Sequence, residues 1–376
     1  MNFANARPPQ LFDLLAREWT LSSPVDGAVF NRGCGTVAAS CEDGSIALAE
    51  TADDDSPTAR VRNAIDTGRQ TIQRRGGPVP PLLEVKGIKR RTTPVVPLGE
   101  SNFLFGDSEG NLSALTPQGD LLSSGHAMDK AISAISASPN NASYACAAGN
   151  LIQIAQWDLG EPSCEIETKQ TINNLAFSPD GQHIAATHDD GVSIWDMSGK
   201  LFKSQKKTLN SAPAKVRWSA DGKWIAYTFA SGGFCLIDLK NNQARNFEDY
   251  PTAVKSIAFS KPANIVATSG AYRAVAWSLE HPLTDSDSCA AVTSGKPGFV
   301  AVDSIAASPD RDLLAVGYAN GLLCLTKIGS QDEMLLRQND DAGISSLSWS
   351  DNGSFLAVGM SNGKFALVEF PIGMFK

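Results

Sequence analysis

The sequence is poor in the residues from which metal sites, disulfide frameworks and most hydrolytic centres are built. It has four histidines and seven cysteines in 376 residues. The cysteines are scattered, with no C-x-x-C pair and no alternation with histidine, which argues against a zinc or disulfide framework and favours a reducing compartment. No G-x-S-x-G elbow, P-loop or H-E-x-x-H motif occurs. We therefore expect a protein that is not an enzyme, with no catalytic residues, no metal and no cofactor.

Long apolar runs and an excess of positive charge are also missing. No stretch of about 18 apolar residues is present to span a membrane, and the N-terminal residues lack the apolar core of a signal peptide. The net charge of −8 argues against a protein that coats nucleic acid through its overall charge. These absences predict a soluble, cytoplasmic protein with no membrane span.

What the sequence does contain is a repeated unit. Each unit opens with alternating apolar and polar residues, as in INNLAFSPDG, and continues through a turn cluster and a small apolar run to a tight-turn pair such as Asp190-Gly191. Alternation with period two indicates strands with one face toward a core, and Gly or Asn tolerates the positive φ of a two-residue hairpin. The residues that close the first apolar run of each unit are Phe30, Leu98, Ala137, Phe177, Trp218, Phe259, Ala307 and Trp349.

The spacing of these residues gives the architecture. From Leu98 onward they step by 39, 40, 41, 41, 48 and 42 residues, and the first step is 68. Three or four short antiparallel strands every ~40 residues is the arithmetic of a β-propeller blade. The sequence predicts an all-β fold, a single β-propeller of about eight four-stranded antiparallel blades, with seven blades as the alternative. A loop at 280–298 accounts for the 48-residue step.

The units resemble those of the WD-repeat (WD40) propeller family. In the fourth unit Ser178-Pro179-Asp180-Gly181, Asp190-Gly191 and Trp195-Asp196 are similar to the family's SPDG, DG and WD elements. The resemblance covers roughly residues 18–370, and the other units match it only in part. The chain is therefore identified as a divergent, bacterial-type member. The resemblance implies that the N-terminal strand closes the ring, with EWTLSSP (18–24) pairing with KFALVEF of the last unit.

The predicted domains are an N-terminal tail at 1–17 and a propeller at 18–371, with a basic insertion at 51–80 inside the first blade. From residue 60 to residue 91 there are nine basic residues against two acidic ones. Such asymmetry favours either a basic element that docks an acidic protein partner or a mobile, solvated insertion that is merely tolerated. Val61, Ile65 and Ile72 follow a near-helical spacing, which Gly68 weakens. No aromatic residue is interleaved for base stacking, so nucleic acid is the weaker interpretation.

The resemblance implies a non-enzymatic scaffold or adaptor that mediates protein–protein interactions, as a monomeric propeller within a complex. In that family, partners commonly bind the face that carries the hairpin between the second and third strands and the links between blades. The predicted partner-binding residues on that face are His188, Asp189, Tyr272, Arg273, Tyr318, Asn320, Met360 and Asn362. Those in the insertion are Arg60, Arg62, Arg69, Arg74 and Arg75.

The alternative is a propeller enzyme, or a binder of a small ligand or metal, that uses acidic loop residues near the central axis. Its candidate residues are Asp43, Glu109, Asp189, Asp190, Asp340 and Asp341. It requires at least three carboxylates to converge on one point, whereas turns favour Asp for backbone reasons alone. A third interpretation is binding of an anionic surface by residues 60–91, which predicts that binding falls as salt is raised.

Overall fold

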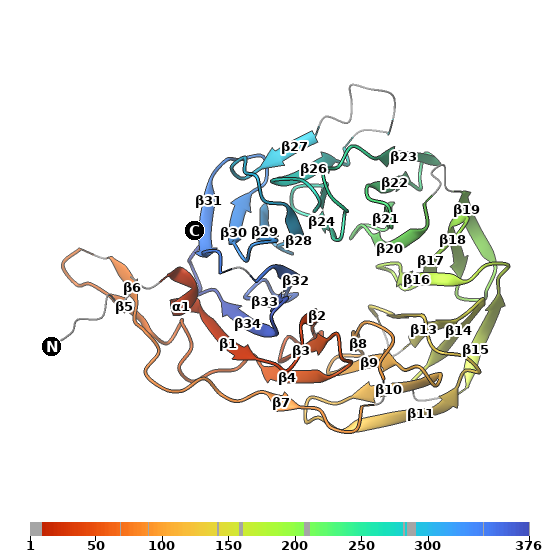
Figure 1. Ribbon diagram of the computed structural model, residues 1–376, viewed down its shortest axis with the longest axis horizontal. Helices are drawn as coiled ribbons and strands as arrows, with labels where there is room; N and C mark the ends of the chain where they lie inside the picture. Colours follow the sequence, from red (N-terminus) through yellow and green to blue (C-terminus); the bar gives the residue numbers. More distant parts are fainter. Residues whose placement is uncertain are drawn as a thin grey trace.

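Eight four-stranded sheets are arranged around an axis in the computed structural model (Figure 1). The structure describes residues 10–67, 69–88, 90–140, 143–157, 161–206, 211–280, 283, 291–340 and 342–375. Within each sheet the strands are antiparallel and, apart from closure of the ring, follow in chain order from the axis outward. The predicted all-β propeller is therefore confirmed, with eight blades and not seven. None of the helices among these residues is long and apolar enough to cross a membrane.

The strands of the first four blades follow the repeated units of the sequence. Blade one contains β2 (Val25–Phe30), β3 (Thr36–Cys41), β4 (Ile46–Glu50) and β7 (Leu83–Glu84), and blade two contains β8 (Val96–Leu98), β9 (Asn102–Gly106), β10 (Asn111–Leu115) and β11 (Leu121–Ala127). Blade three contains β12 (Ala134–Ala137), β13 (Ser143–Ala148), β14 (Leu151–Gln156) and β15 (Pro162–Glu167), and blade four contains β16 (Ile172–Phe177), β17 (His183–His188), β18 (Gly191–Asp196) and β19 (Leu201–Lys206).

The remaining blades continue the same order. Blade five contains β20 (Pro213–Trp218), β21 (Trp224–Phe229), β22 (Phe234–Asp238) and β23 (Gln243–Phe247), and blade six contains β24 (Ile257–Ser260), β25 (Ile265–Thr268), β26 (Ala274–Ser278) and β27 (Ala291–Ser294). Blade seven contains β28 (Val302–Ala307), β29 (Leu313–Tyr318), β30 (Leu323–Lys327) and β31 (Glu333–Arg337), and blade eight contains β32 (Ile344–Trp349), β33 (Phe355–Met360), β34 (Lys364–Glu369) and β1 (Ala16–Thr20).

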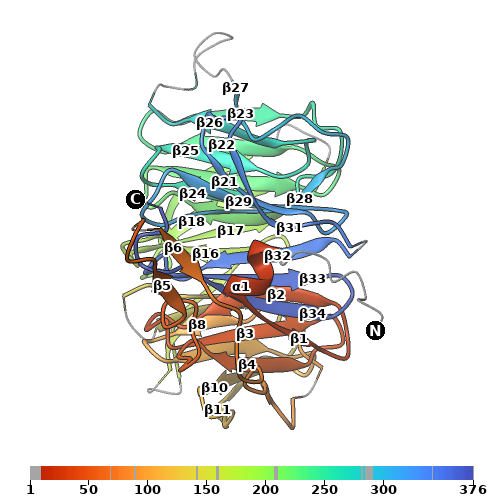
Figure 2. The ribbon, with the colours of Figure 1, turned by 90° about the vertical axis from the view of Figure 1, so that its left-hand side faces the viewer.

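The N-terminal strand closes the ring, as predicted. β1 forms the outer edge of blade eight by pairing antiparallel with β34, with Glu18 opposite Ala366 and Thr20 opposite Lys364. Just before it, the short helix α1 (Leu11–Leu15) packs Phe12 and Leu15 into the core between blades seven and eight. The side view shows α1 on the outside of the ring beside β1 (Figure 2). The division into a tail at 1–17 and a propeller at 18–371 stays a prediction.

The core consists of eight hydrophobic clusters, one between each pair of neighbouring blades. The second strands lie between two such clusters and are buried along their length, as in β3, β13 and β21. Both faces of these strands need small or apolar side chains, because each face packs on an adjacent blade. This explains the runs of Ala, Val, Ile and Gly that follow each turn cluster in the sequence.

The Ser-x-Asp-Gly elements are local turns that shape the first hairpin of a blade. In blade four Ser178 Oγ donates to Asp180 Oδ1 at 2.5 Å, and the His183 N–H donates back to Ser178 Oγ at 2.9 Å. Gly181 completes the turn with φ +68°. Ser219 and Ser350 anchor the same turn in blades five and eight. The motif therefore serves backbone geometry, not chemistry.

Among its described residues, the basic insertion contains a hairpin and no helix. β5 (Val61–Asn63) pairs with β6 (Gln70–Ile72), with Arg62 opposite Thr71. The helix that the near-helical spacing of the apolar residues suggested is therefore wrong. Val61 and Ile72 lie opposite each other in the register, and both are half-buried, whereas Ile65 in the loop between the strands is fully exposed. In Figure 1 the hairpin projects from the ring beside α1.

Candidate functional site

The loop face of the ring is formed by the hairpins between second and third strands together with the links between blades. Backbone hydrogen bonds connect the two sets around the ring: Met128 donates to Gly110, Thr252 to Gly270, and Val302 to Ala271. A residue on this face is therefore held by two neighbouring blades. Such a rigid frame can present side chains to a partner at low entropic cost.

The structure divides the eight sequence-predicted residues of this face into two groups. His188, Tyr318 and Met360 are buried, because each is the last residue of a second strand and not part of the turn that follows. Asp189, Tyr272 and Asn362 are exposed, and Arg273 and Asn320 are half-buried. The structure therefore brings only part of the predicted set to the surface.

His188 has a structural environment. Its Nε2 lies 2.9 Å from Ser193 Oγ, which in turn lies 3.1 Å from Ser204 Oγ on the next strand. The N–H of Asp190 donates to His188 Nδ1 at 3.3 Å, which requires that nitrogen to be unprotonated. Burial lowers the pKa of His188, although Asp190 and Asp189 oppose the shift. The imidazole is therefore a neutral link between strands of blade four.

An exposed aromatic pair on the loop face joins blades six and seven. Phe299, in the link that leads into β28, is 97% exposed, and Tyr272, in the hairpin of blade six, is 43% exposed. The two loops are adjacent: Val302 donates to the carbonyl of Ala271 at 2.8 Å, and a Cβ on Gly298 would lie 3.6 Å from the Tyr272 carbonyl. Arg273 and Lys296 flank the pair in sequence. We call these four residues the blade six/seven patch.

Sequence reasoning missed Phe299. The preceding loop at 280–298 was considered only as the cause of the 48-residue step, and residues 281–282 and 284–290 of that loop lie outside the described residues. A signal was present nevertheless: KPGFV places one aromatic between a Gly/Pro turn and a first strand, where the core has no place for it. An exposed large apolar side chain of this kind marks an interaction surface when it lies with others.

The arginines of the insertion also divide into two groups. Arg60 is buried, and its guanidinium donates to the carbonyls of Leu14, Asp55 and Gln73 at 2.8, 3.0 and 2.5 Å. Arg75 forms two hydrogen bonds to Asp53, at 2.6 and 2.8 Å. The other three, Arg62, Arg69 and Arg74, are exposed on and beside the β5–β6 hairpin. Arg60 thus holds the insertion to the N-terminal helix, whereas Arg75 pairs within the insertion with Asp53, which in turn faces Arg17 of β1.

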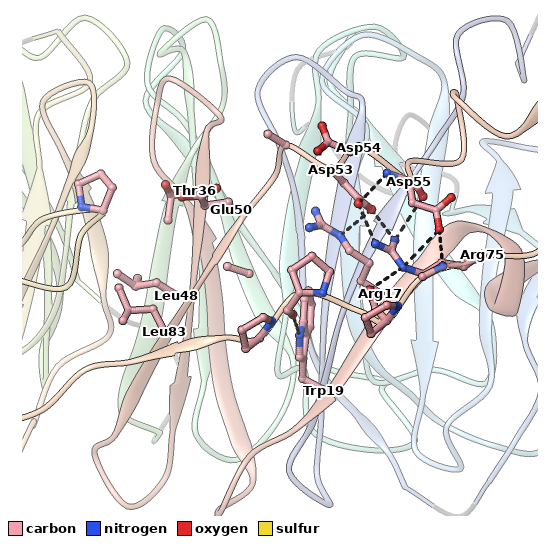
Figure 3. Close-up of a pocket in the computed structure, with 17 residues that line it drawn as sticks. Arg17, Trp19, Thr36, Leu48, Glu50, Asp53, Asp54, Asp55, Arg75 and Leu83 are labelled. Atoms are coloured by element: carbon pink, nitrogen blue, oxygen red, sulfur yellow. Dashed lines mark hydrogen bonds and ion pairs between the residues drawn. The ribbon is translucent and has the colours of Figure 1, made fainter.

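A rim pocket lies where the insertion meets blades eight and one (Figure 3). It has a volume of about 540 Å³. One wall consists of Leu48, Leu83 and a proline-rich strap at 77–81, and Trp19 of β1 lies at its base, where its Nε1 donates to the Pro80 carbonyl at 2.7 Å. Trp19 also stacks on Phe365, with ring centroids 5.7 Å apart. The acidic segment 52–55 forms the opposite wall.

The charges beside the rim pocket are largely paired. Figure 3 shows Arg17 and Arg75 converging on Asp53 and Asp55. Burial opposes ionisation of Asp53, but hydrogen bonds from Arg75 and the charge of Arg17 outweigh it, so the pKa of Asp53 is lowered. Glu50 and Asp54 also line the pocket, and both are exposed. In the described chain neither of these two carboxylates has a salt bridge, so the pocket carries an excess of negative charge.

The acidic residues proposed for the alternative function belong to local turns. Asp43 accepts from Ser45, Asp190 accepts from Gln170, and Asp340 pairs with Arg337. Asp341 lies outside the described residues. Within the described ranges, no group of three or more His, Cys, Asp or Glu side chains is arranged to hold a metal ion.

Comparisons with known proteins agree with this architecture. A family model described as "WD domain, G-beta repeat" matches residues 160–196, and one described as "Anaphase-promoting complex subunit 4 WD40 domain" matches residues 305–374. The chain is similar to "Small ribosomal subunit protein RACK1" of Dictyostelium discoideum, 32% identical over 22% of this chain and 30% of the relative. It is also similar to "COMPASS component SWD3" of Saccharomyces cerevisiae, 25% identical over 48% of this chain and 59% of the relative.

These two relatives are matched over less than two thirds of their length. Among solved structures, the computationally designed Ika8 protein is similar in fold, with a TM-score of 0.66 at 17% identity, over 93% of this chain and 98% of that one. That likeness concerns the fold alone. The third to fourth and the seventh to eighth units of this eight-bladed propeller thus match models of the WD repeat, the family that its sequence motifs resemble.

Proposed function

We propose that this protein is a non-enzymatic scaffold that binds one or more protein partners through its loop face, at the blade six/seven patch. The observation that carries the proposal is the exposed pair Tyr272 and Phe299, held by two neighbouring blades and flanked by Arg273 and Lys296. Aromatic and arginine residues are the commonest anchors of protein interfaces, and a fully exposed Phe on a rigid loop gains most from being covered.

The names of the matched proteins support this class of function. One relative is a protein of the small ribosomal subunit, another is a component of COMPASS, and one family model describes a subunit of the anaphase-promoting complex. Each name is that of a part of a larger assembly. From these names we carry over to this chain only the general role of a monomeric propeller within a complex. The partners are proteins of unknown identity. A cytoplasmic location and a bacterial type remain predictions from the sequence.

The experiment is affinity capture from the native lysate with identification by mass spectrometry. A Tyr272→Ala/Phe299→Asp variant is compared with the wild-type chain and with Leu201→Asp, which changes an exposed apolar residue on the outer strand β19. We expect the partners to disappear with the first variant and to remain with the second. The absence of any stoichiometric partner of the wild-type chain would refute the scaffold function.

A second variant separates the loop face from the insertion. Arg62→Glu/Arg69→Glu/Arg74→Glu reverses the three exposed arginines and leaves Arg60 and Arg75 in place. Loss of partners with this variant, and not with Tyr272→Ala/Phe299→Asp, would move the interface to the β5–β6 hairpin. If the wild-type chain also loses these partners when salt is raised, an anionic partner surface is favoured, since screening weakens exposed charge pairs.

A further inference from the structure

Beside the rim pocket, the outer edge of blade one is open. The fourth strand of that blade, β7, pairs with β4 at only two positions, Ala47 with Glu84 and Leu48 with Leu83. The other seven blades have outer strands of four to seven residues. The last residues of β4 therefore have no neighbouring strand on their outer side.

The register shows which backbone groups are left open. Val85 donates to the carbonyl of Ile46, whereas Thr51 donates to Gly35 on the inner side. Residues 46, 48 and 50 thus direct their N–H and C=O groups outward, because these directions alternate along a strand. Glu50 would face Pro81, which has no N–H to donate. Among the backbone hydrogen bonds of the described residues, none joins Glu50 to the strap.

The charges that line the pocket select a cation. Asp53 and Asp55 are compensated by Arg17 and Arg75, whose positions are fixed by those contacts. Glu50 and Asp54 are left over, and both lie at the pocket (Figure 3). A lysine or arginine side chain fits this combination, since its aliphatic stem can lie along the apolar strap while its charged head reaches the carboxylates.

We propose that the rim pocket is a second docking site, for an extended segment of a partner protein that carries a lysine or arginine side chain. The backbone of that segment pairs with the open edge of β4 at Glu50. Its basic side chain enters the pocket between the strap and the acidic segment. Strand addition supplies affinity through main-chain hydrogen bonds, and the pocket supplies specificity for the side chain.

The site is distinct from the loop face and from the exposed insertion arginines, so this inference does not depend on the proposed function. The loop-face patch joins blades six and seven, whereas the rim pocket lies between blades eight and one. A partner can therefore be held at two places, which raises its apparent affinity when both are engaged.

The test is a selection of random linear heptapeptides displayed on phage, with the full-length chain as the immobilised target. We expect enrichment of peptides with a Lys or Arg flanked by β-branched residues. Peptides chosen in this way are then measured by fluorescence polarisation. Against Glu50→Lys/Asp54→Lys their binding should weaken by at least about tenfold, the effect of losing one charge-assisted contact.

Two controls keep the result specific. Asp312→Lys/Glu167→Lys makes the same change in net charge with two exposed acids on other blades, and binding should stay within about twofold. Leu83→Ser alters the apolar wall without changing charge and should weaken binding. Tyr272→Ala/Phe299→Asp should leave it unchanged, which separates this site from the loop face.

Three outcomes would overturn the proposal. One is the selection of acidic or uncharged peptides, and another is the failure to enrich any consensus. The third is equal weakening by both charge-reversal pairs, which would mean that the peptides respond to the net charge of the protein and not to the pocket.

Discussion

Replacing Arg60 by Met should release the insertion from the propeller without unfolding the ring. Arg60 is 7% exposed and is the only described arginine of the insertion whose donors reach the N-terminal helix. Its guanidinium donates to three carbonyls, those of Leu14, Asp55 and Gln73. Met retains the aliphatic stem, so the substitution removes the donors and the charge while leaving most of the packing volume.

The magnitude follows from those three bonds. A hydrogen bond from a charged donor contributes ~1.5–3 kcal/mol, and a carbonyl freed at the rim regains part of this from water. We therefore expect the local opening free energy of the insertion to fall by ~3 kcal/mol. Since about 1.4 kcal/mol is a factor of ten, amide exchange in this segment should accelerate by ~100-fold or more. Of the eight inter-blade clusters only the one between blades seven and eight contacts the described residues of the insertion, through Ile72 at its edge, so global unfolding should change little.

Hydrogen exchange read by mass spectrometry measures the effect on peptides that cover 56–80. The N–H groups of Gln73 and Ala64 report on the hairpin, because they donate to the carbonyls of Arg60 and Arg69. Arg62→Met is the matched control: Arg62 is exposed and, among the described residues, donates only to the carbonyls of Ala59 and Val61, so exchange should stay within about threefold. Unchanged exchange in Arg60→Met would refute the anchoring role. A large fall in the melting temperature would show instead that Arg60 supports the ring itself.

Three further predictions concern the stability and reactivity of the propeller. Burial lowers the pKa of His188 below its ordinary value of 6.5, so the unfolded chain binds the proton first as pH falls; stability measured by urea titration should decline as the pH drops below 6.5, and this contribution should vanish in His188→Gln. Gly110→Ala should cost ~2–4 kcal/mol in urea unfolding, because φ is +88° and the new Cβ would collide with the Met128 carbonyl, whereas Gly99→Ala, at φ +58° with open space, should cost only ~1 kcal/mol. Among the six described cysteines, iodoacetamide at pH 8 should label Cys164 first in peptide mapping, since it alone is not buried and burial raises the pKa of Cys146 to about 12; prior labelling of Cys146 would contradict the packing of blade three.

Local signals in the sequence were enough to predict the blades. The Ser178–Asp180 turn is completed within six residues of chain, and the same grammar recurs near Ser219 and Ser350. Such turns, with the alternation before them, fix each blade by itself, so their count gave eight without knowledge of any contact between blades. Closure by the N-terminal strand was implied by the family resemblance, although the strand that closes the ring is Ala16–Thr20 and not residues 18–24.

The candidate sites depend on contacts that no local pattern records. Arg60 and Arg75 were predicted to bind a partner because they lie in a basic stretch, but Arg60 donates to Leu14 of the N-terminal helix and Arg75 pairs with Asp53 across the insertion. Tyr318 and Met360 were placed on the surface because they precede turns. Because β29 and β33 extend through Tyr318 and Met360, these residues lie in the core, where both faces of a second strand pack on neighbouring blades.

Closure of the ring by β1 also has a consequence for the order of folding during synthesis. β1 leaves the ribosome before every strand of blades one to seven, yet its partner β34 follows all of them. At ~5–20 residues per second the stretch between Thr20 and its partner Lys364 takes roughly 17–70 s to make, and through that time β1 has no partner strand. Blades one to seven can form in succession as their residues emerge. Blade eight joins β1 to β32, β33 and β34 and can therefore form only after the other seven. A chain that stops before β34 cannot close the ring.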